Sequence, residues 1–348
     1  MTRRRSRGGR WIARLGLLLA ASIAWWLYAP YAAFSSPHLL VIAPGTSSWE
    51  MAQRLADEGI VRRAAVFEIW RLLHPGAVLK AGTYRFTAPA STVDVFDRLA
   101  RGDVYFLALT VPEGFSRFDI ERALQTLHSP AAADFLRVSA DPMSVRDLDP
   151  QAPSLEGFLF PATYRLPPLA TAQDVVGFMV RRFREELRAP AQAAVLRQLR
   201  ASPAGRMPTS LHDWLTMASL IEKESALPGE RPRIAAVFYN RLERHMLLQC
   251  DPTVIYAAER DQRYSGHIGH DDLTYDSPYN TYLHLGLPPG PIANPGLNAL
   301  QAAAHPEASD YLYFVSNGAG AHRFARTLAD HEQNVAGFLQ SRKKVPDS

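Results

Sequence analysis

A short polar run, Glu222-Lys223-Glu224-Ser225, follows an apolar segment that begins at Leu211. A carboxyl group in this setting could act as a general acid, because apolar surroundings raise its pKa toward the working pH. The pair Pro228-Gly229 then interrupts the chain, and a second amphipathic segment leads to Gln249 and Asp251. The candidate acid-base chemistry of the sequence therefore lies between residues 211 and 251.

Apolar residues recur at helical spacing from Leu211 to Ile221, which predicts a helix that packs into the core on most of its surface. At about 100° per residue, Lys223 points furthest from the apolar face, and Glu222 and Glu224 lie on its two flanks. Glu224 falls in the last turn, where the helix dipole disfavours a carboxylate by about 0.3 to 1 kcal/mol. Periodicity does not choose between the two acids, position favours Glu224 only slightly, and both could be surface groups paired with Lys223 or with arginines.

The composition is that of a folded protein, since 47% of the 348 residues are hydrophobic and 21% are charged. The first fourteen residues hold six arginines and no acid; the 38 lysines and arginines less these six leave 32, against 34 acids. Binding of nucleic acid therefore has no electrostatic support beyond this tail. The single cysteine, Cys250, cannot form an internal disulfide. The six arginines are Arg3, Arg4, Arg5, Arg7, Arg10 and Arg14.

Residues 15–34 form an uncharged apolar stretch that is long enough, as a helix, to cross a bilayer core of roughly 30 Å. Trp25, Trp26 and Tyr28 crowd its far end, as in an interfacial aromatic belt. The positive-inside rule then predicts a cytoplasmic tail over residues 1–14, a single transmembrane helix over 15–34 in the inner (cytoplasmic) membrane, and a body on the periplasmic or extracytoplasmic side. A cleaved signal peptide shares this order, but its apolar region usually has only roughly 7 to 15 residues.

The next segment predicts a strand over residues 39–43, a helix capped by Ser47 with Glu50, a helix over 66–73 and a strand over 82–86. This order resembles a LysM-type module, a fold that binds N-acetylglucosamine-containing glycans in other proteins; the alternative is a spacer domain. A helix over 92–100, a strand over 105–111 and a helix capped by Ser116 follow, and residues 172–199 form a long helical region. We expect a module over 38–108 and a second domain over 109–348.

The segment from Ser154 to Tyr164 places aromatic residues around one acid, Glu156. Such aromatics resemble the wall of a sugar-binding groove, because aromatic faces stack on the apolar faces of pyranose rings. The alternative is that these side chains fill the core.

Four separated segments resemble the YceG-like endolytic murein transglycosylases, and the similarity extends from about His38 to Val335. They are ASLIEKESALPGERPRIAAVFYNRL, LLQCDPTVIYA, SPYNTYLHLGLPPGPIANPG and YLYFVSNGAGAHRFARTLADHEQNV. In that family a glutamate followed by Ser or Thr, at the end of such a helix, is the catalytic acid and base. The resemblance therefore selects Glu224, followed by Ser225, and leaves Glu222 as a structural or supporting group.

The resemblance implies an α+β fold whose catalytic domain contains a lysozyme-like helical active-site element. It also implies cleavage of the β-1,4 bond between N-acetylmuramic acid and N-acetylglucosamine within nascent glycan strands, which ends their elongation beside the peptidoglycan synthases. Glu224 would protonate the glycosidic oxygen and then take the proton of the muramic C6 hydroxyl as it closes on C1, leaving a 1,6-anhydro end. An intramolecular hydroxyl near C1 reduces the need for the second carboxylate of ordinary glycosidases.

The surrounding motifs are expected to contact the glycan. Gln249 and Asp251 follow the second amphipathic segment, and Tyr279-Asn280-Thr281-Tyr282 offers amide and phenol groups. Each of these could instead serve loop architecture without contact. The predicted glycan-binding residues are Glu156, Ser225, Asn240, Gln249, Asp251, Thr253, Tyr279, Asn280, Tyr282 and His322.

Two positions depart from the family pattern: Cys250 stands where Thr or Ser is usual, and Ala162 follows Phe160-Pro161 where an acid is common. The first change is nearly isosteric and is expected to leave catalysis unaffected, whereas the second puts a binding role at that position in doubt. The sequence has no His-Glu-x-x-His, Cys-x-x-Cys or Gly-x-Ser-x-Gly motif, so we expect no metal or cofactor.

Two other functions stay open. A hydrolytic glycosidase could pair Glu224 with Glu156 or Asp251 and would leave a free reducing end. A non-catalytic scaffold of the cell-wall synthesis machinery could bind peptidoglycan through the LysM-like module.

Overall fold

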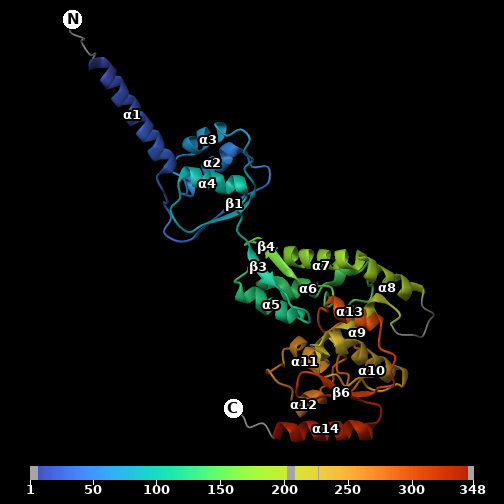
Figure 1. Cartoon of the computed structure of the whole chain (residues 1–348). Coiled ribbons are helices and arrows are strands. Elements are labelled where there is room, and N and C mark those ends of the chain that lie inside the picture. The colour runs from blue at the N-terminus through green and yellow to red at the C-terminus, as the bar shows by residue number, and fades with distance from the viewer. Residues whose placement is uncertain (1–6, 202–207, 226, 344–348) are drawn as a thin grey trace. The chain divides into compact units, whose positions relative to one another are not determined.

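The computed structural model describes residues 7–201, 208–225 and 227–343, and the chain divides into two compact units, Met1–Leu107 and Ala108–Ser348 (Figure 1). Within the described residues, helices are joined by short strands that pair into three two-stranded sheets. This mixture confirms the α+β class expected from the sequence. The predicted boundary between residues 108 and 109 lies beside the division between the units.

The first unit packs two strands and three helices around one apolar core. Strand β1 (His38–Ile42) pairs antiparallel with β2 (Gly82–Phe86), and α2 (Ser48–Asp57), α3 (Ala64–Leu72) and α4 (Thr92–Arg101) complete the layer of helices. Leu40 and Ile42 of β1 are buried while Leu39 and Val41 face outward, as the period of a strand requires. The predicted order of strand, helix, helix and strand is confirmed.

The N-terminal segment differs from its prediction as a transmembrane helix over residues 15–34. Helix α1 (Arg7–Tyr28) ends two residues before Pro30, which cannot continue a helix. The apolar residues that are helical therefore rise roughly 21 Å, less than a bilayer core of roughly 30 Å. Of the helices in the described ranges, none combines the length and apolar character needed to cross a membrane. The arginines at positions 3 to 5 lie outside the described residues.

The second unit begins with a small sheet and a group of helices. Strand β3 (Leu107–Thr110) pairs with β4 (Thr163–Leu166), and α5 (Arg117–Thr126), α6 (Ala132–Ser139) and the 3-10 turn η1 (Pro142–Val145) lie between them in the chain. The long helical region predicted over 172–199 is two helices, α7 (Ala172–Arg188) and α8 (Pro190–Ala201). The break falls at Pro190, which lacks the N–H that a helix interior needs and starts the second helix.

The rest of the second unit is built around α9 (Leu211–Glu224), which is buried continuously from Trp214 to Glu222. Helix α13 (Leu297–Ala304) packs against α9, and the Trp214 indole N–H donates to the Leu300 carbonyl at 2.7 Å. The other elements of this part of the chain are η2 (Pro228–Glu230), α10 (Arg231–Glu243), α11 (Asp251–Arg260), α12 (His270–Leu273), β5 (Tyr313–Ser316), β6 (His322–Ala325) and α14 (Leu328–Lys343). Strands β5 and β6 pair antiparallel and contact α14 (Figure 1).

Glu156 is buried, with 1% of its surface exposed, and does not face a groove. Its carboxylate accepts the Arg117 backbone N–H at 3.0 Å and the Asn294 side-chain amide at 2.8 Å. Asn294 in turn accepts the N–H groups of Gly157 and Leu159, so Glu156 and Asn294 join three segments of the chain. The predicted glycan contact by Glu156 is therefore wrong, because these internal bonds turn the carboxylate inward.

The aromatic residues near Glu156 fill the core instead of lining a groove. Phe158 is fully buried, and Phe160 and Tyr164 are no more than 9% exposed. The Tyr164 hydroxyl donates to the Phe160 carbonyl. Of the two interpretations that the sequence left open here, core packing is the one that the structure supports.

The stability of the protein is expected to fall as the pH rises past the ionisation of Glu156. Burial raises the pKa of Glu156 to about 7, although the Arg117 N–H and charge oppose this shift. In the unfolded chain a glutamate has a pKa of about 4.3, so between these values the folded state binds more protons. Urea denaturation should show up to about 3 kcal/mol less stability at pH 8 than at pH 4.5.

The variant Glu156→Gln should flatten this decrease, because its side chain does not titrate. The exposed residue Glu185 gives a matched control, and Glu185→Gln should keep the wild-type pH dependence. If Glu156→Gln has the same slope as the wild type between pH 4.5 and 7, another group carries the pH dependence.

Candidate active site

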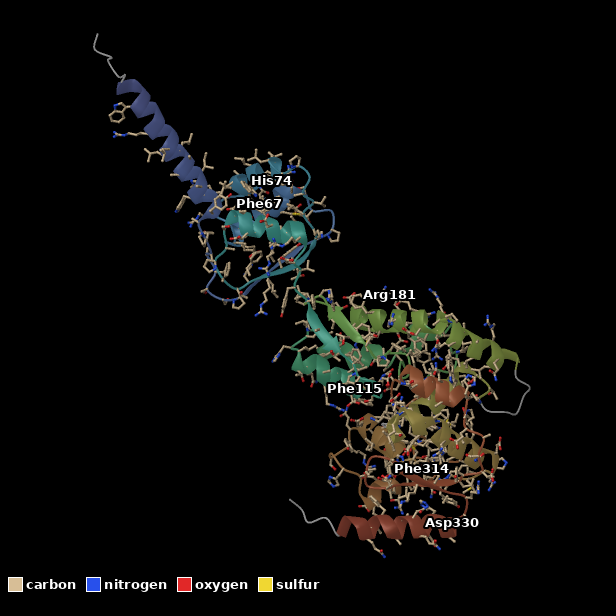
Figure 2. All side chains as sticks on the ribbon, in the orientation of Figure 1. Phe67, His74, Phe115, Arg181, Phe314 and Asp330 are labelled. Carbon is tan, nitrogen blue, oxygen red and sulfur yellow. The ribbon has the colours of Figure 1, made fainter. Side chains whose placement is uncertain are left out.

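The end of α9 opens into a pocket of about 440 Å³ within the second unit. Its walls come from α9, α10, the loop that leads into α11, the strands β5 and β6, and α14. In Figure 2 the Phe314 side chain of β5 lies in the same part of the unit as Asp330 of α14, and these two elements are in contact. The pocket is lined by Glu224, Arg241, Leu248, Gln249, Asp251, Tyr282, Phe314, Val315, Ser316, His322, His331 and Val335.

Glu224 is the last residue of α9 and places its half-buried carboxyl group in the pocket. Burial raises the pKa of Glu224, and the nearby charge of Asp251 adds to this effect. A hydrogen bond from the Cys250 thiol and the charges of His322 and Arg241 act in the opposite direction without cancelling it. A carboxyl group whose pKa is raised in this way stays protonated nearer to neutral pH, as a general acid must.

Glu222, the other acid on the helix, faces the interior instead of the pocket. Its carboxylate pairs with the Arg231 guanidinium and accepts the Gly296 N–H at 3.0 Å. Only 4% of the Glu222 side chain and 6% of the Arg231 side chain are exposed. The structure thus separates two acids that helical periodicity could not separate, since Glu224 lines the pocket and Glu222 holds the fold together.

Arg241 fixes the loop that enters the pocket. Its guanidinium donates to the carbonyls of Leu312 at 2.7 Å and Leu248 at 2.9 Å, and to the Gln249 side-chain oxygen at 3.3 Å. Burial lowers the pKa of Arg241. Gln249 has a φ of 51°, a left-handed conformation that is uncommon for a residue other than glycine. These bonds hold Gln249 at the pocket despite that backbone cost.

Asp251 and Tyr282 form a second polar group at the pocket. The Tyr282 hydroxyl donates to the Asp251 carboxylate, and burial raises the pKa of Tyr282. Asp251 is exposed and Tyr282 half-buried, so both remain within reach of a ligand. Of the ten residues predicted to bind glycan, the structure brings Gln249, Asp251, Tyr282 and His322 together with Glu224.

Two other predicted glycan contacts bind backbone groups instead. The Ser225 hydroxyl accepts the Leu227 N–H at 3.1 Å and closes the end of α9. The Asn240 amide donates to the carbonyls of Ser309 and Tyr311 at 2.8 and 2.9 Å. Neither residue lines the pocket, so the alternative of loop architecture fits both.

Thr253, Tyr279 and Asn280 also do not line the pocket, and each is at most 4% exposed. The Thr253 hydroxyl donates to the Cys250 carbonyl at 2.7 Å, and Tyr279 packs against Tyr256 with ring centroids 5.0 Å apart. The Asn280 amide donates to two loop carbonyls, at 3.0 and 2.8 Å. These side chains shape the loop from which Asp251 and Tyr282 reach the pocket.

Four polar or aromatic residues of the pocket were not predicted from the sequence. Arg241 lies in a segment quoted for the family resemblance, and an arginine within a buried helix face could have indicated a structural role. His331 stacks on Tyr313 at 5.1 Å, and burial lowers its pKa. The others are Phe314 and Ser316 on β5. His331, Phe314 and Ser316 also lie in a segment quoted for the resemblance, but no local pattern places α14 or β5 beside α9, so only the fold reveals these contacts.

Cys250 contacts the candidate acid directly. Its thiol is 1% exposed and donates to the Glu224 carboxylate, and burial raises the pKa of the thiol. The expectation that a cysteine here has no effect on catalysis did not include this contact. Within the described ranges, no three His, Cys, Asp or Glu side chains are grouped to hold a metal ion. The pocket therefore contains one carboxyl group with a raised pKa, that of Glu224, surrounded by polar side chains.

Comparison with known proteins gives consistent matches over most of the chain. A model of the YceG-like family matches residues 40–337. The chain is 30% identical over 319 residues to the endolytic murein transglycosylase of Bacillus subtilis strain 168, covering 87% of this chain and 85% of that protein. It is 29% identical over 350 residues to the protein of the same name from Streptococcus pneumoniae strain R6, covering 90% of this chain and 60% of that protein. A crystal structure of a yceG-like protein from Listeria monocytogenes matches with a TM-score of 0.56 and 32% identity, over 86% of this chain and 99% of that one.

Proposed function

The chain belongs to the YceG-like family, and we propose that it is a lytic transglycosylase that cleaves peptidoglycan strands internally. The bond cleaved is the β-1,4 bond between N-acetylmuramic acid and N-acetylglucosamine, and the product carries a 1,6-anhydro end. The observation that carries this proposal is Glu224, a single carboxyl group of raised pKa at the end of a buried helix and at the edge of a polar pocket. The relatives named as endolytic murein transglycosylases support the same reaction.

Glu224 acts first as the acid. It protonates the glycosidic oxygen, and the bond between C1 and that oxygen breaks. The muramic C6 hydroxyl, held near C1 within the same sugar, closes on C1, and its proton restores the Glu224 carboxyl group. Gln249, Asp251 and Tyr282 hold the sugar by its hydroxyl and acetamido groups, and Arg241 keeps the Gln249 loop in place. This assignment gives the pocket the role of the lysozyme-like helical element expected from the sequence.

Hydrolysis is the second candidate reaction, because a second carboxyl group, that of Asp251, lies in the same pocket as Glu224. A second carboxylate could activate water, and the product would then have a free reducing end. Digestion of uncrosslinked glycan strands, followed by mass spectrometry of the ends, separates the two reactions. Anhydro ends, one water lighter, support the transglycosylase; free reducing ends overturn it in favour of the hydrolase, and uncut strands support a binding scaffold.

The pH dependence of cleavage should respond to Cys250. A hydroxyl is a stronger hydrogen-bond donor than a thiol, so Cys250→Ser should stabilise the Glu224 carboxylate and lower its pKa. Because the acid must be protonated, the basic limb of the kcat/KM profile should move to lower pH by up to about one unit. Cys250→Ala, which removes the donor, should move the limb to higher pH. Profiles that coincide for both variants would show that the thiol does not tune Glu224.

We also propose that the chain acts at the outer face of the cytoplasmic membrane, attached through its N-terminal segment. The exposed leucines of α1 and the tryptophans at its end support this location. The Arg62 guanidinium lies 4.4 Å from the Trp25 ring and Trp26 accepts a bond from Thr92, so this end of α1 is tied to the first unit. Replacing Leu17, Leu18 and Leu19 by serine should move the protein from the membrane fraction to the soluble fraction.

The strand and helix order of the first unit supports its assignment as a LysM-like module. At the outer face of the membrane, the new glycan strands made by the peptidoglycan synthases are the natural substrate. The synthases themselves are candidate partners.

A further inference from the structure

Glu230 holds His322 at two points beside the pocket. One carboxylate oxygen accepts the His322 backbone N–H at 2.9 Å, and the other lies 2.8 Å from the ring Nδ1. The two side chains are only 14% and 15% exposed. Glu230 ends the short turn η2, more than ninety residues before His322 at the start of β6. The pair therefore joins two elements that the chain brings together only by folding.

This geometry fixes the tautomer and the orientation of the imidazole. A carboxylate only accepts hydrogen bonds, so Nδ1 carries the proton and a neutral ring leaves Nε2 as an acceptor. No described residue bonds Nε2. Phe314 packs edge to face on the ring, with centroids 5.4 Å apart, and limits its rotation. His322 and Glu224 line the same pocket, and their charges interact.

Glu230 is suited to remain an anion. Burial alone would raise its pKa, but the backbone and ring hydrogen bonds of His322, with the charges of His322 and Arg233, together lower it. A permanent carboxylate behind an imidazole stabilises the imidazolium that forms when Nε2 takes a proton. Glu230 on η2 is the charged group bonded to the ring, and Arg233 on α10 acts on Glu230. The charged or acidic residues that line the pocket with His322 are Glu224 on α9, Arg241 on α10 and Asp251 on α11.

We propose that His322, positioned by Glu230, is a second acid-base residue that accepts the proton of the muramic C6 hydroxyl at Nε2 and passes it to Glu224. This inference rests on the proposed transglycosylase reaction. In this assignment Glu224 donates the proton to the glycosidic oxygen and His322 accepts the proton of the C6 hydroxyl, whereas otherwise Glu224 would carry out both transfers.

The step balances without a further reactant. Glu224 gives its proton to the glycosidic oxygen, which leaves C1 with the electron pair of the broken bond. A lone pair of the C6 oxygen forms the new bond to C1, and the hydroxyl proton goes to Nε2. The imidazolium then returns this proton to the Glu224 carboxylate, and both groups regain their starting states.

The full chain tests this assignment in kinetic assays of anhydro-end formation on uncrosslinked strands. His322→Gln keeps an amide near the position of Nε2 but cannot relay a proton, so kcat should fall about 100- to 10,000-fold while KM changes less than about threefold. Glu230→Gln should lower kcat about tenfold or more, again without a matching change in KM. Imidazole added to His322→Ala should restore part of the lost rate, which a purely structural role would not allow.

The surface pair His284 and Asp276, 3.2 Å apart and outside the pocket, supplies the control, and His284→Gln should keep the wild-type rate. A His322→Gln chain with wild-type kcat overturns the relay while leaving the transglycosylase assignment intact. If His322→Gln does not fold, the kcat of Glu230→Gln and the titration of His322→Ala with imidazole test the relay instead. A His322→Ala chain that imidazole does not rescue contradicts the relay. A wild-type chain that forms no anhydro ends refutes the proposed function, and the relay with it.

Discussion

Replacing Glu224 by glutamine should abolish strand cleavage, with kcat reduced about 1,000-fold or more, while the protein stays folded. Loss of a general acid typically costs a factor of about 100 to 10,000, and here the same group also regains the proton at the end of the reaction. The amide keeps the size of the side chain and an oxygen that can accept the Cys250 thiol hydrogen bond. Mass spectrometry of new anhydro ends measures the activity, and urea denaturation measures the fold.

Glu243 provides a matched control for this variant. It is the last residue of α10, as Glu224 is the last residue of α9, but it is exposed and does not line the pocket. Glu243→Gln should therefore cleave at the wild-type rate. Full activity in Glu224→Gln, with a folded protein, would remove Glu224 from the mechanism and return attention to Asp251.

The local part of this site could be predicted from the sequence because it depends on neighbouring residues. The helix over 211 to 224, its apolar faces and the carboxyl group at its end follow from periodicity and from Pro228. Periodicity describes which way a side chain points but not what it meets. The distinction between Glu222 and Glu224 depends on distant residues that the fold brings to them, Arg231 and Gly296 to Glu222, and Cys250 to Glu224.

Long-range contacts explain the residues that were assigned wrongly or overlooked. Glu156 looks like a groove acid beside aromatics, but Asn294, far along the chain, binds it in the interior. His331 enters the pocket from α14, with no local signal of chemistry around it. The predicted transmembrane helix is not supported for a local reason instead, since the count of apolar residues ran through Pro30 whereas α1 ends at Tyr28, so less of the apolar stretch is helical than expected.

Replacing Arg231 by methionine should destabilise the protein by about 3 to 5 kcal/mol, because it leaves the Glu222 carboxylate buried and without its partner. Burial already raises the pKa of Glu222, and the Arg231 charge now opposes that rise. Without the arginine the pKa should rise further. A raised pKa in the folded state means that stability falls as pH rises, so the loss should be smaller at pH 4.5 than at pH 8. Urea denaturation at both pH values measures the difference.

The surface pair of Arg137 with Asp134 is the control, since both side chains are more than half exposed, and Arg137→Met should leave the urea midpoint unchanged. The double variant Glu222→Gln with Arg231→Met should recover part of the lost stability, because no buried charge remains. A loss that is the same at both pH values and is not recovered in the double variant would mean that Arg231 stabilises by packing, not by neutralising Glu222.

Arg231 also links this pair to the acid in the pocket. Its Nε donates at 3.3 Å to the carbonyl of Ser225, the C-cap residue that follows Glu224. The double variant should recover part of the stability without restoring this bond, so its folded chain should cleave strands more slowly than the wild type. This result would separate the role of the buried pair from that of the catalytic carboxyl group. Glu222 and Arg231 would stabilise the end of α9, and Glu224 would transfer the proton from that position.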